Sequence, residues 1–272
     1  MYWIYDIPTW LLGLFTVSTF VLVSILGLIV SRGWAGRTFR LSDETNEAVN
    51  GFFAGVGVMY SLLLGLVAVA VWQNFDSSNA LASKEAAAIV ALYRDVSAFP
   101  VEVRSKLQNH LAKYLHYVID SEFPAHQRGE TPGGGTLILS GFQGLLTSYQ
   151  PATVNQEVIL AEALTAFNKV IEARRLRVDA VNTGIPSVFW TVIMVGAVLS
   201  IVLTYTFHLP TLKTHLLLTG IYSMFLGFVI FLVASFDNPF RGEMSISPEA
   251  YSLILENLKD RDPANLNQPA GE

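Results

Sequence analysis

The sequence contains no cysteine, few charged residues and no excess of basic side chains. Without cysteine, disulfide bonds, thiolate catalysis and cysteine-ligated zinc sites are excluded. Lysine and arginine together number 17 against 22 acidic residues, so the formal net charge is −5 and the basic footprint of a nucleic-acid-binding protein is missing. Only 14% of the 272 residues are charged and 52% are hydrophobic, which is unlike the composition of a soluble domain.

Charged residues are completely absent from four apolar runs, which lie at 9–30, 51–72, 185–207 and 216–236. The hydrocarbon core of a bilayer is ~30 Å thick and needs roughly 20 helical residues, so each run is long enough to cross it. The runs lack the alternation of barrel strands, and together they are too long for the buried helices of a soluble protein. The sequence therefore predicts an all-α integral membrane protein with four transmembrane helices.

A polar stretch of about a hundred residues separates the second run from the third. With four crossings, this insert and both termini must lie on the same side of the membrane. We expect four parts along the chain: transmembrane helices one and two at 1–75, a helical soluble domain at 76–182, transmembrane helices three and four at 183–236, and a tail at 237–272.

The insert shows apolar residues at helical spacing in several segments. The first segment is expected to begin near Ser83, and Pro100 separates it from a second segment that Pro124 should end. A long helix is predicted at 154–181. From Pro263 onward the composition indicates disorder. One apolar face on each helix predicts that the insert folds as a helical bundle.

The orientation follows from the basic residues near the membrane ends. The insert side carries six of them and the opposite side four. The positive-inside rule then predicts a cytoplasmic insert and cytoplasmic termini, by a small margin because long loops count less.

Val58, Leu62 and Leu66 share one face of the second apolar run, because they stand at i, i+4 and i+8. Leu64 lies about 200° around the helix from Leu62. From the spacing alone, the three residues fit a lipid-facing or core position as well as a functional one.

Three arginines, Arg174, Arg175 and Arg177, stand just before the third run. Two partners are open to them. They can pair with anionic lipid headgroups at the membrane surface, or with acids of the insert such as Glu85.

Catalytic and metal-binding patterns are weak. His110 and His116 are six residues apart, so they do not share a helix face as metal ligands at i, i+4 do. Glu122 and His126 are separated by Pro124, which interrupts the helical geometry that a ligand pair needs. The chain also lacks a phosphate-binding glycine loop and a nucleophile motif. We expect a protein that is not an enzyme, with no metal site and no cofactor.

Six segments carry a more specific pattern. They read YSLLLGL at 60–66, KEAAAIVALYRD at 84–95, YVIDSEFP at 117–124, ARRLRVDA at 173–180, IPSVFW at 185–190 and DNPFRGEMSISPEAY at 237–251. In this order they resemble the bestrophin-like family of bacterial membrane proteins, a domain of unknown function. The resemblance covers about residues 50–260.

Three short steps also resemble, more distantly, the bestrophin ion channels: Leu64-Gly65-Leu66, Gly184-Ile185-Pro186 and the segment at 238–242. The resemblance implies a homopentamer around a central pore in the cell inner membrane, with a cytoplasmic insert and cytoplasmic termini. It places Val58, Leu62 and Leu66 at the pore neck. It also marks a turn after the fourth helix, formed by Asp237, Asn238, Pro239, Phe240 and Gly242.

One departure concerns calcium. In calcium-activated bestrophins a run of acids follows this turn and binds the ion, whereas here Glu243 is followed by Met244 and Ser245. Calcium takes six to eight oxygen ligands, which one carboxylate does not supply. We therefore expect no calcium gating of that kind.

The sequence thus predicts a homo-oligomeric channel that passes small monovalent ions of undetermined sign. Its partners would be the lipid bilayer, further copies of itself and those ions, with no nucleic acid. The alternative is a membrane scaffold or sensor that binds a protein partner through its helical domain and conducts nothing. A pentamer with an axial hole favours the channel, and a monomer or closed dimer favours the scaffold.

Overall fold

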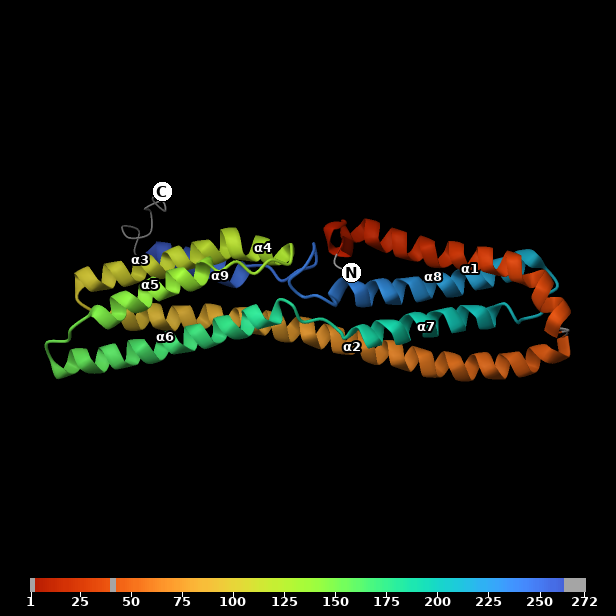
Figure 1. The fold of residues 1–272 in the computed structure, drawn as a ribbon, viewed down its shortest axis with the longest axis horizontal. Helices are drawn as coiled ribbons and strands as arrows, with labels where there is room; N and C mark the ends of the chain where they lie inside the picture. The colour runs from red at the N-terminus through yellow and green to blue at the C-terminus, as the bar shows by residue number, and fades with distance from the viewer. Residues whose placement is uncertain (1–2, 40–42, 262–272) are drawn as a thin grey trace. The chain divides into compact units, whose positions relative to one another are not determined.

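The computed structural model describes residues 3–39 and 43–261, and within these ranges the chain is helical with no strand (Figure 1). The segment from Pro263 onward, which the sequence predicts to be disordered, lies outside the described residues. The elements are η1 Trp3–Asp6, α1 Thr9–Phe39, α2 Asp43–Val96, α3 Val101–Tyr117, η2 Val118–Glu122, α4 Phe123–Gln127, α5 Gly134–Ser148, α6 Val154–Ala180, α7 Ser187–Thr204, α8 Leu212–Phe236 and α9 Glu249–Arg261.

The helices gather into two compact units. One, here called the membrane unit, comprises Met1–Asn74 and Gly184–Asp237. The other, here called the polar unit, comprises Phe75–Thr183 and Asn238–Glu272. Each unit has a hydrophobic core of its own.

Four helices are long and apolar enough to cross a membrane, as the sequence predicted. The qualifying segments are Thr9–Gly33, Thr45–Val96, Ser187–Thr204 and Leu212–Phe236. Within the membrane unit α1 runs alongside α8, and α7 also contacts α8 (Figure 1). The all-helical class and the membrane character of the chain are thereby confirmed.

The core of the membrane unit fixes α2 against α7. The Tyr60 hydroxyl donates a hydrogen bond of 2.7 Å to the carbonyl oxygen of Ile193. Gly196 allows this approach, because a Cβ atom at that position would lie 2.3 Å from the Tyr60 ring. Leu64 and Val67 continue the buried side of α2 toward Ile230 on α8.

The second apolar run continues without interruption into the polar unit. We expected a new helix near Ser83, but α2 extends as one helix from Asp43 to Val96. The reason lies in the sequence: no glycine or proline stands between Gly65 and Pro100, so nothing breaks the backbone hydrogen bonds. The prediction of a separate start near Ser83 was wrong.

The expected helix end at Pro124 was also wrong. The chain stays helical through a π-helical turn at Val118–Glu122 and then through α4, Phe123–Gln127. Pro124 stands in the first turn of α4, where its missing N–H matters least. A widened π turn before it accommodates the ring that would clash in a regular α-helix.

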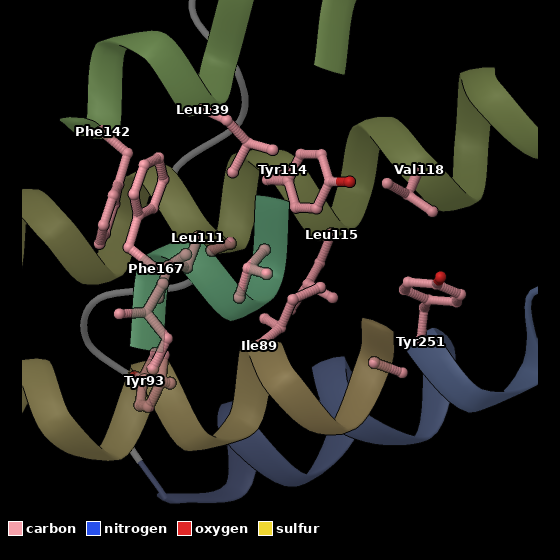
Figure 2. Packing of buried hydrophobic residues seen from close by; sticks show 14 of the residues in the cluster. Ile89, Tyr93, Leu111, Tyr114, Leu115, Val118, Leu139, Phe142, Phe167 and Tyr251 are labelled. Atoms are coloured by element: carbon pink, nitrogen blue, oxygen red, sulfur yellow. The ribbon is translucent and has the colours of Figure 1, made fainter. Parts of the chain in front are cut away.

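The polar unit packs around aromatic and branched side chains from the end of α2 and from α3, α5, α6 and α9 (Figure 2). Phe142 on α5 stacks on Phe167 on α6, with ring centroids 5.3 Å apart. Ile89 on α2 and Leu111 and Leu115 on α3 are fully buried in the same core. Helix α6 begins at Val154 as predicted, where the Thr153 hydroxyl accepts a capping bond from the backbone N–H of Gln156.

Candidate functional site

The residues expected at a pore neck form an exposed apolar row on α2. Val58, Leu62 and Leu66 have exposed fractions of 67, 63 and 63%. Leu64 is only 4% exposed, because it points into the core of the membrane unit. Residues that the spacing placed on one helix face therefore share one surface, which the described part of this chain leaves open.

Several glycines accompany this row on α2. A Cβ atom added at Gly51, Gly55, Gly57 or Gly65 would meet no atom within 4 Å outside its own stretch of helix. Glycines that face open space in this way let a second helix approach closely within lipid. The surface of α2 around the row is therefore suited to contact with another helix, which residues 3–39 and 43–261 do not provide.

Asp237, the first residue of the expected turn, ends α8 within the membrane unit. Its carboxylate accepts a hydrogen bond of 2.6 Å from the backbone N–H of Ile185 and one of 3.1 Å from the indole N–H of Trp190. Burial raises the pKa of Asp237, and these two hydrogen bonds oppose the rise. The carboxylate lies beside the first turn of α7, where the helix dipole favours negative charge.

The rest of the turn belongs to the polar unit. The backbone N–H of Arg241 bonds to the carbonyl oxygen of Asn238 at 3.1 Å, and that of Ile246 bonds to the carbonyl oxygen of Pro239 at 2.8 Å. Gly242 has a φ of 73°, a backbone conformation that residues other than glycine rarely adopt. The sequence Asn-Pro-Phe-Arg-Gly thus forms a tight, hydrogen-bonded turn.

Phe240 anchors this turn in the polar unit. It is 1% exposed and packs against Phe123 and His126, with ring centroids 6.1 and 6.0 Å away. Its two neighbours come from α4, the short helix that follows the π-helical turn. The turn therefore packs against α4, a helix that the sequence analysis did not expect because of Pro124.

A buried ionic network lies next to this contact. Arg177 donates to the Glu85 carboxylate at 2.5 Å and to the Glu122 carboxylate at 2.9 Å. Arg174 donates to both oxygens of Glu122, at 2.7 and 2.8 Å. The side chains of Glu85 and Arg177 are 0% exposed and that of Glu122 is 1% exposed. Two carboxylates thus face two guanidinium groups, and the network is balanced in charge.

Two tyrosines complete the coordination of Glu85. The Tyr114 hydroxyl donates to one carboxylate oxygen and the Tyr251 hydroxyl donates to the other, the latter at 3.1 Å. Tyr114 also accepts a hydrogen bond of 2.8 Å from Arg174. Burial and the nearby Glu85 charge raise the pKa of both tyrosines well above its ordinary value, so they remain hydroxyl donors.

His126 is held in one tautomer. Arg177 has only donors, so the His126 Nε2 atom, 2.9 Å away, must accept. The Nδ1 atom therefore carries the proton and donates it to the carbonyl oxygen of Glu130 at 2.9 Å. Burial lowers the pKa of His126 and the Arg177 charge lowers it further, against the bond to Glu130, so the ring stays neutral.

The shifts of the charged partners agree with this arrangement. Burial alone would raise the pKa of Glu122, but the Arg174 hydrogen bonds and the two guanidinium charges outweigh it and leave that pKa lowered. Burial lowers the pKa values of Arg174 and Arg177, but their acidic partners outweigh this effect and leave both pKa values raised. Glu122, Arg174 and Arg177 are therefore ionised at neutral pH.

The structure decides between the two partners that the sequence left open for the arginines. Arg174 and Arg177 pair with Glu122 and Glu85, whereas Arg175 is exposed and lies 3.9 Å from Asp179. Sequence reasoning missed Glu122 and His126 as members of this network. Their spacing was a signal, since residues at i and i+4 share a helix face. We set this pair aside in the sequence analysis because Pro124 stands between the two residues.

No group of three or more His, Cys, Asp or Glu side chains able to hold a metal ion occurs in the described ranges. Glu122 and His126, the pair that the sequence analysis weighed as metal ligands, are both bound by Arg177. The acceptor atoms of Glu122 and His126 are therefore engaged by hydrogen-bond donors of the protein itself.

Comparison with known proteins gives a family and a fold. The family model described as the Bestrophin-like domain matches residues 18–251. A variant of a bacterial bestrophin homologue from Klebsiella pneumoniae, 16% identical, superposes with a TM-score of 0.63 over 94% of this chain and 99% of that chain. A second variant of that homologue, 15% identical, gives 0.63 over 90% and 98%.

A crystal structure described only as a membrane protein is similar to the same extent, with 15% identity and a TM-score of 0.61 over 94% of this chain and 99% of that chain. No curated protein matches the sequence. At these identities the solved structures show a shared fold.

Proposed function

Since this chain belongs to the Bestrophin-like family, we propose that it is a homo-oligomeric ion channel that passes small monovalent ions. The observation that carries the proposal is the row of Val58, Leu62 and Leu66, which is exposed along one side of α2 while Leu64 is buried on the other. A channel needs such a surface, because its pore is lined by side chains that no single subunit covers.

Self-association is supported by the glycines of α2. Gly55 and Gly65 leave room for the close approach of another helix, and small residues at helix contacts are the usual basis of association in lipid. We propose a homopentamer, the assembly that the resemblance to bestrophin channels implies. In it the row would surround the axis and the glycine-bearing flanks would meet neighbouring subunits.

An apolar neck acts by controlling water. A narrow ring of valine and leucine side chains loses its water and blocks ions, whereas a ring of charge selects ions by sign. The proposed neck residues carry no charge, so they form a barrier to anions and cations alike. The sign of the conducted ion then depends on charges outside the neck.

The placement in the cell is part of the proposal. We place the protein in the cell inner membrane, with the polar unit and both termini in the cytoplasm. The family resemblance and the excess of basic residues on that side support this orientation. The run of acids that binds calcium in calcium-activated bestrophins is absent after the turn, so we propose a channel that does not require calcium.

Reconstitution in planar bilayers tests the proposal. Purified full-length protein should give ion currents in asymmetric potassium chloride, and the reversal potential will give the sign of the permeant ion. Native mass spectrometry in detergent should show a pentamer. A monomer or closed dimer that gives no current would overturn the channel and support the scaffold or sensor instead.

A further inference from the structure

A cavity of about 270 Å³ lies in the polar unit, and none of the charged residues of the buried ionic network lines it. Its walls come from the end of α2, the first half of α3 and α9. The lining residues are Val90, Tyr93, Arg94, Ser97, Arg104, Gln108 and Leu258. This volume is near the lower end for ligand pockets, about 300 Å³, so it suits a small molecule.

Two arginines line this cavity without acidic partners. Neither Arg94 nor Arg104 forms an ion pair with any side chain in the described part of the chain. Arg94 is exposed and Arg104 is partly exposed, so both guanidinium groups are open to solvent. Arg104 lies one turn into α3, where the helix N-terminus favours anions. Two unneutralised guanidinium groups suit a ligand that carries two negative charges.

Gln108 adds an unusual acceptor to the same cavity. It is 3% exposed, and its side-chain oxygen Oε1 is buried without a hydrogen-bond partner. Its Nε2 atom donates to the Ser97 hydroxyl at 3.2 Å. Buried polar atoms normally have partners, so an unsatisfied oxygen on a residue that lines a cavity indicates that a donor can be bound there.

The orientation of the Gln108 amide follows from Ser97. The Ser97 hydroxyl donates its only proton to the carbonyl oxygen of Tyr93 at 2.9 Å. It therefore accepts from Gln108, which places the Gln108 NH₂ group toward Ser97 and leaves Oε1 free. The site thus combines two cations with one neutral acceptor.

We propose that this cavity binds a small phosphate monoester. The phosphate group carries about −1.5 to −2 charges at neutral pH and its oxygens match the planar fork of arginine. A hydroxyl group on the organic part of the ligand donates to Oε1 of Gln108. A single carboxylate would leave one of the two arginines unneutralised, so a phosphate fits the pair better.

Isothermal titration calorimetry on the purified full-length protein tests this site, with three probes at constant ionic strength. Glycerol 3-phosphate has the dianion and the hydroxyl donors, sulfate has the charge without a donor, and glycerol has the donors without the charge. We expect saturable binding of glycerol 3-phosphate, roughly tenfold weaker binding of sulfate, and no binding of glycerol.

Substitutions then assign the interactions. Arg94→Met and Arg104→Met should each weaken glycerol 3-phosphate binding by roughly tenfold or more. Lys106→Met is the matched control, because Lys106 is exposed on α3 two residues from Arg104, pairs with Glu102 and does not line the cavity. Gln108→Met keeps the side-chain volume but removes the acceptor, so it should abolish the preference for glycerol 3-phosphate over sulfate.

Three results would overturn the proposal. They are the absence of saturable binding to the wild-type protein, an effect of Lys106→Met as large as that of Arg104→Met, and an unchanged preference in Gln108→Met. Thermal unfolding of each variant shows whether it is folded, and Arg104→Lys provides a second variant that keeps the charge and loses the fork.

Discussion

Replacing Glu85 by glutamine tests the buried network at its centre. The Glu85 carboxylate accepts hydrogen bonds from Arg177 at 2.5 Å and from the hydroxyls of Tyr114 and Tyr251. Glutamine keeps the shape but removes the charge and turns one acceptor oxygen into an NH₂ donor. Two guanidinium groups then face the single carboxylate of Glu122, so one positive charge stays buried without a counter-charge.

The cost follows from the burial of the pair. Removing one partner of a buried ion pair costs about 3–5 kcal/mol, because the remaining charge is left desolvated. For a protein of this size roughly 2–4 °C of melting temperature are lost for each kcal/mol. We therefore expect Glu85→Gln to lower the melting temperature by roughly 6–20 °C.

Glu102→Gln is the matched control. Glu102 pairs with Lys106 at 2.9 Å, but its side chain is 83% exposed, so the loss of this pair should leave the melting temperature unchanged within error. The double variant Glu85→Leu with Arg177→Met removes both charges and should regain most of the stability that Glu85→Gln loses.

The assay is thermal unfolding of the purified full-length protein, with hydrogen exchange to locate the change. Exchange should rise in α3 and α6, which carry Tyr114 and Arg177. If Glu85→Gln unfolds at the same temperature as Glu102→Gln, or if the double variant is no more stable than the single one, the network does not stabilise the polar unit as argued.

Four further predictions concern the neck, the topology, pH and calcium. Leu62→Ser should raise conductance by admitting water to the proposed neck, while Leu64→Ser should instead disturb the core; equal effects on current would refute the neck. Reporter proteins fused after Gly134 and at the C-terminal end should give the same cytoplasmic signal, and opposite signals would mean a miscounted span. The pKa of His126 is lowered in the folded protein, so on acidification the unfolded chain binds a proton that the folded chain excludes. Stability should therefore fall as pH drops below about 6.5, the ordinary pKa of histidine. In melting curves recorded at several pH values, His126→Leu should flatten this dependence. Adding or chelating micromolar calcium should leave the current unchanged, because Glu243 alone follows the turn, and a steep response would show ligands elsewhere.

The four spans could be predicted because lipid imposes a condition that each segment meets alone. A run of ~20 residues without charge is sufficient evidence for a spanning helix, whatever the rest of the chain does. The end of α2 could not be found in this way. Beyond Trp72 the helix leaves the apolar run and continues to Val96 with polar residues, so the condition that lipid imposes no longer marks it. The absence of glycine and proline between Gly65 and Pro100 allows a continued helix but does not by itself require one.

The buried network shows a different limit. Glu85 and Arg177 are 92 positions apart, and no local periodicity reports a contact at that separation. The local pair of Glu122 and His126 was visible, but it depended on how the chain passes Pro124. A proline in the first turn of a helix is compatible with helix on both sides when a π turn precedes it, and the sequence pattern alone favoured a break.

The charges of the polar unit separate structural arginines from those available to a ligand. The sequence alone does not show that Arg174 and Arg177 differ in burial from Arg94 and Arg104, since all four lie on helices of the polar unit. In the structure the first two are buried and matched by Glu122 and Glu85, so a further anion would face carboxylates already in place. The other two line a cavity beside an unsatisfied amide oxygen, with no acidic partner in the ranges that the structure describes. An incoming dianion would therefore supply at Arg94 and Arg104 the neutralisation that the chain itself supplies at Arg174 and Arg177.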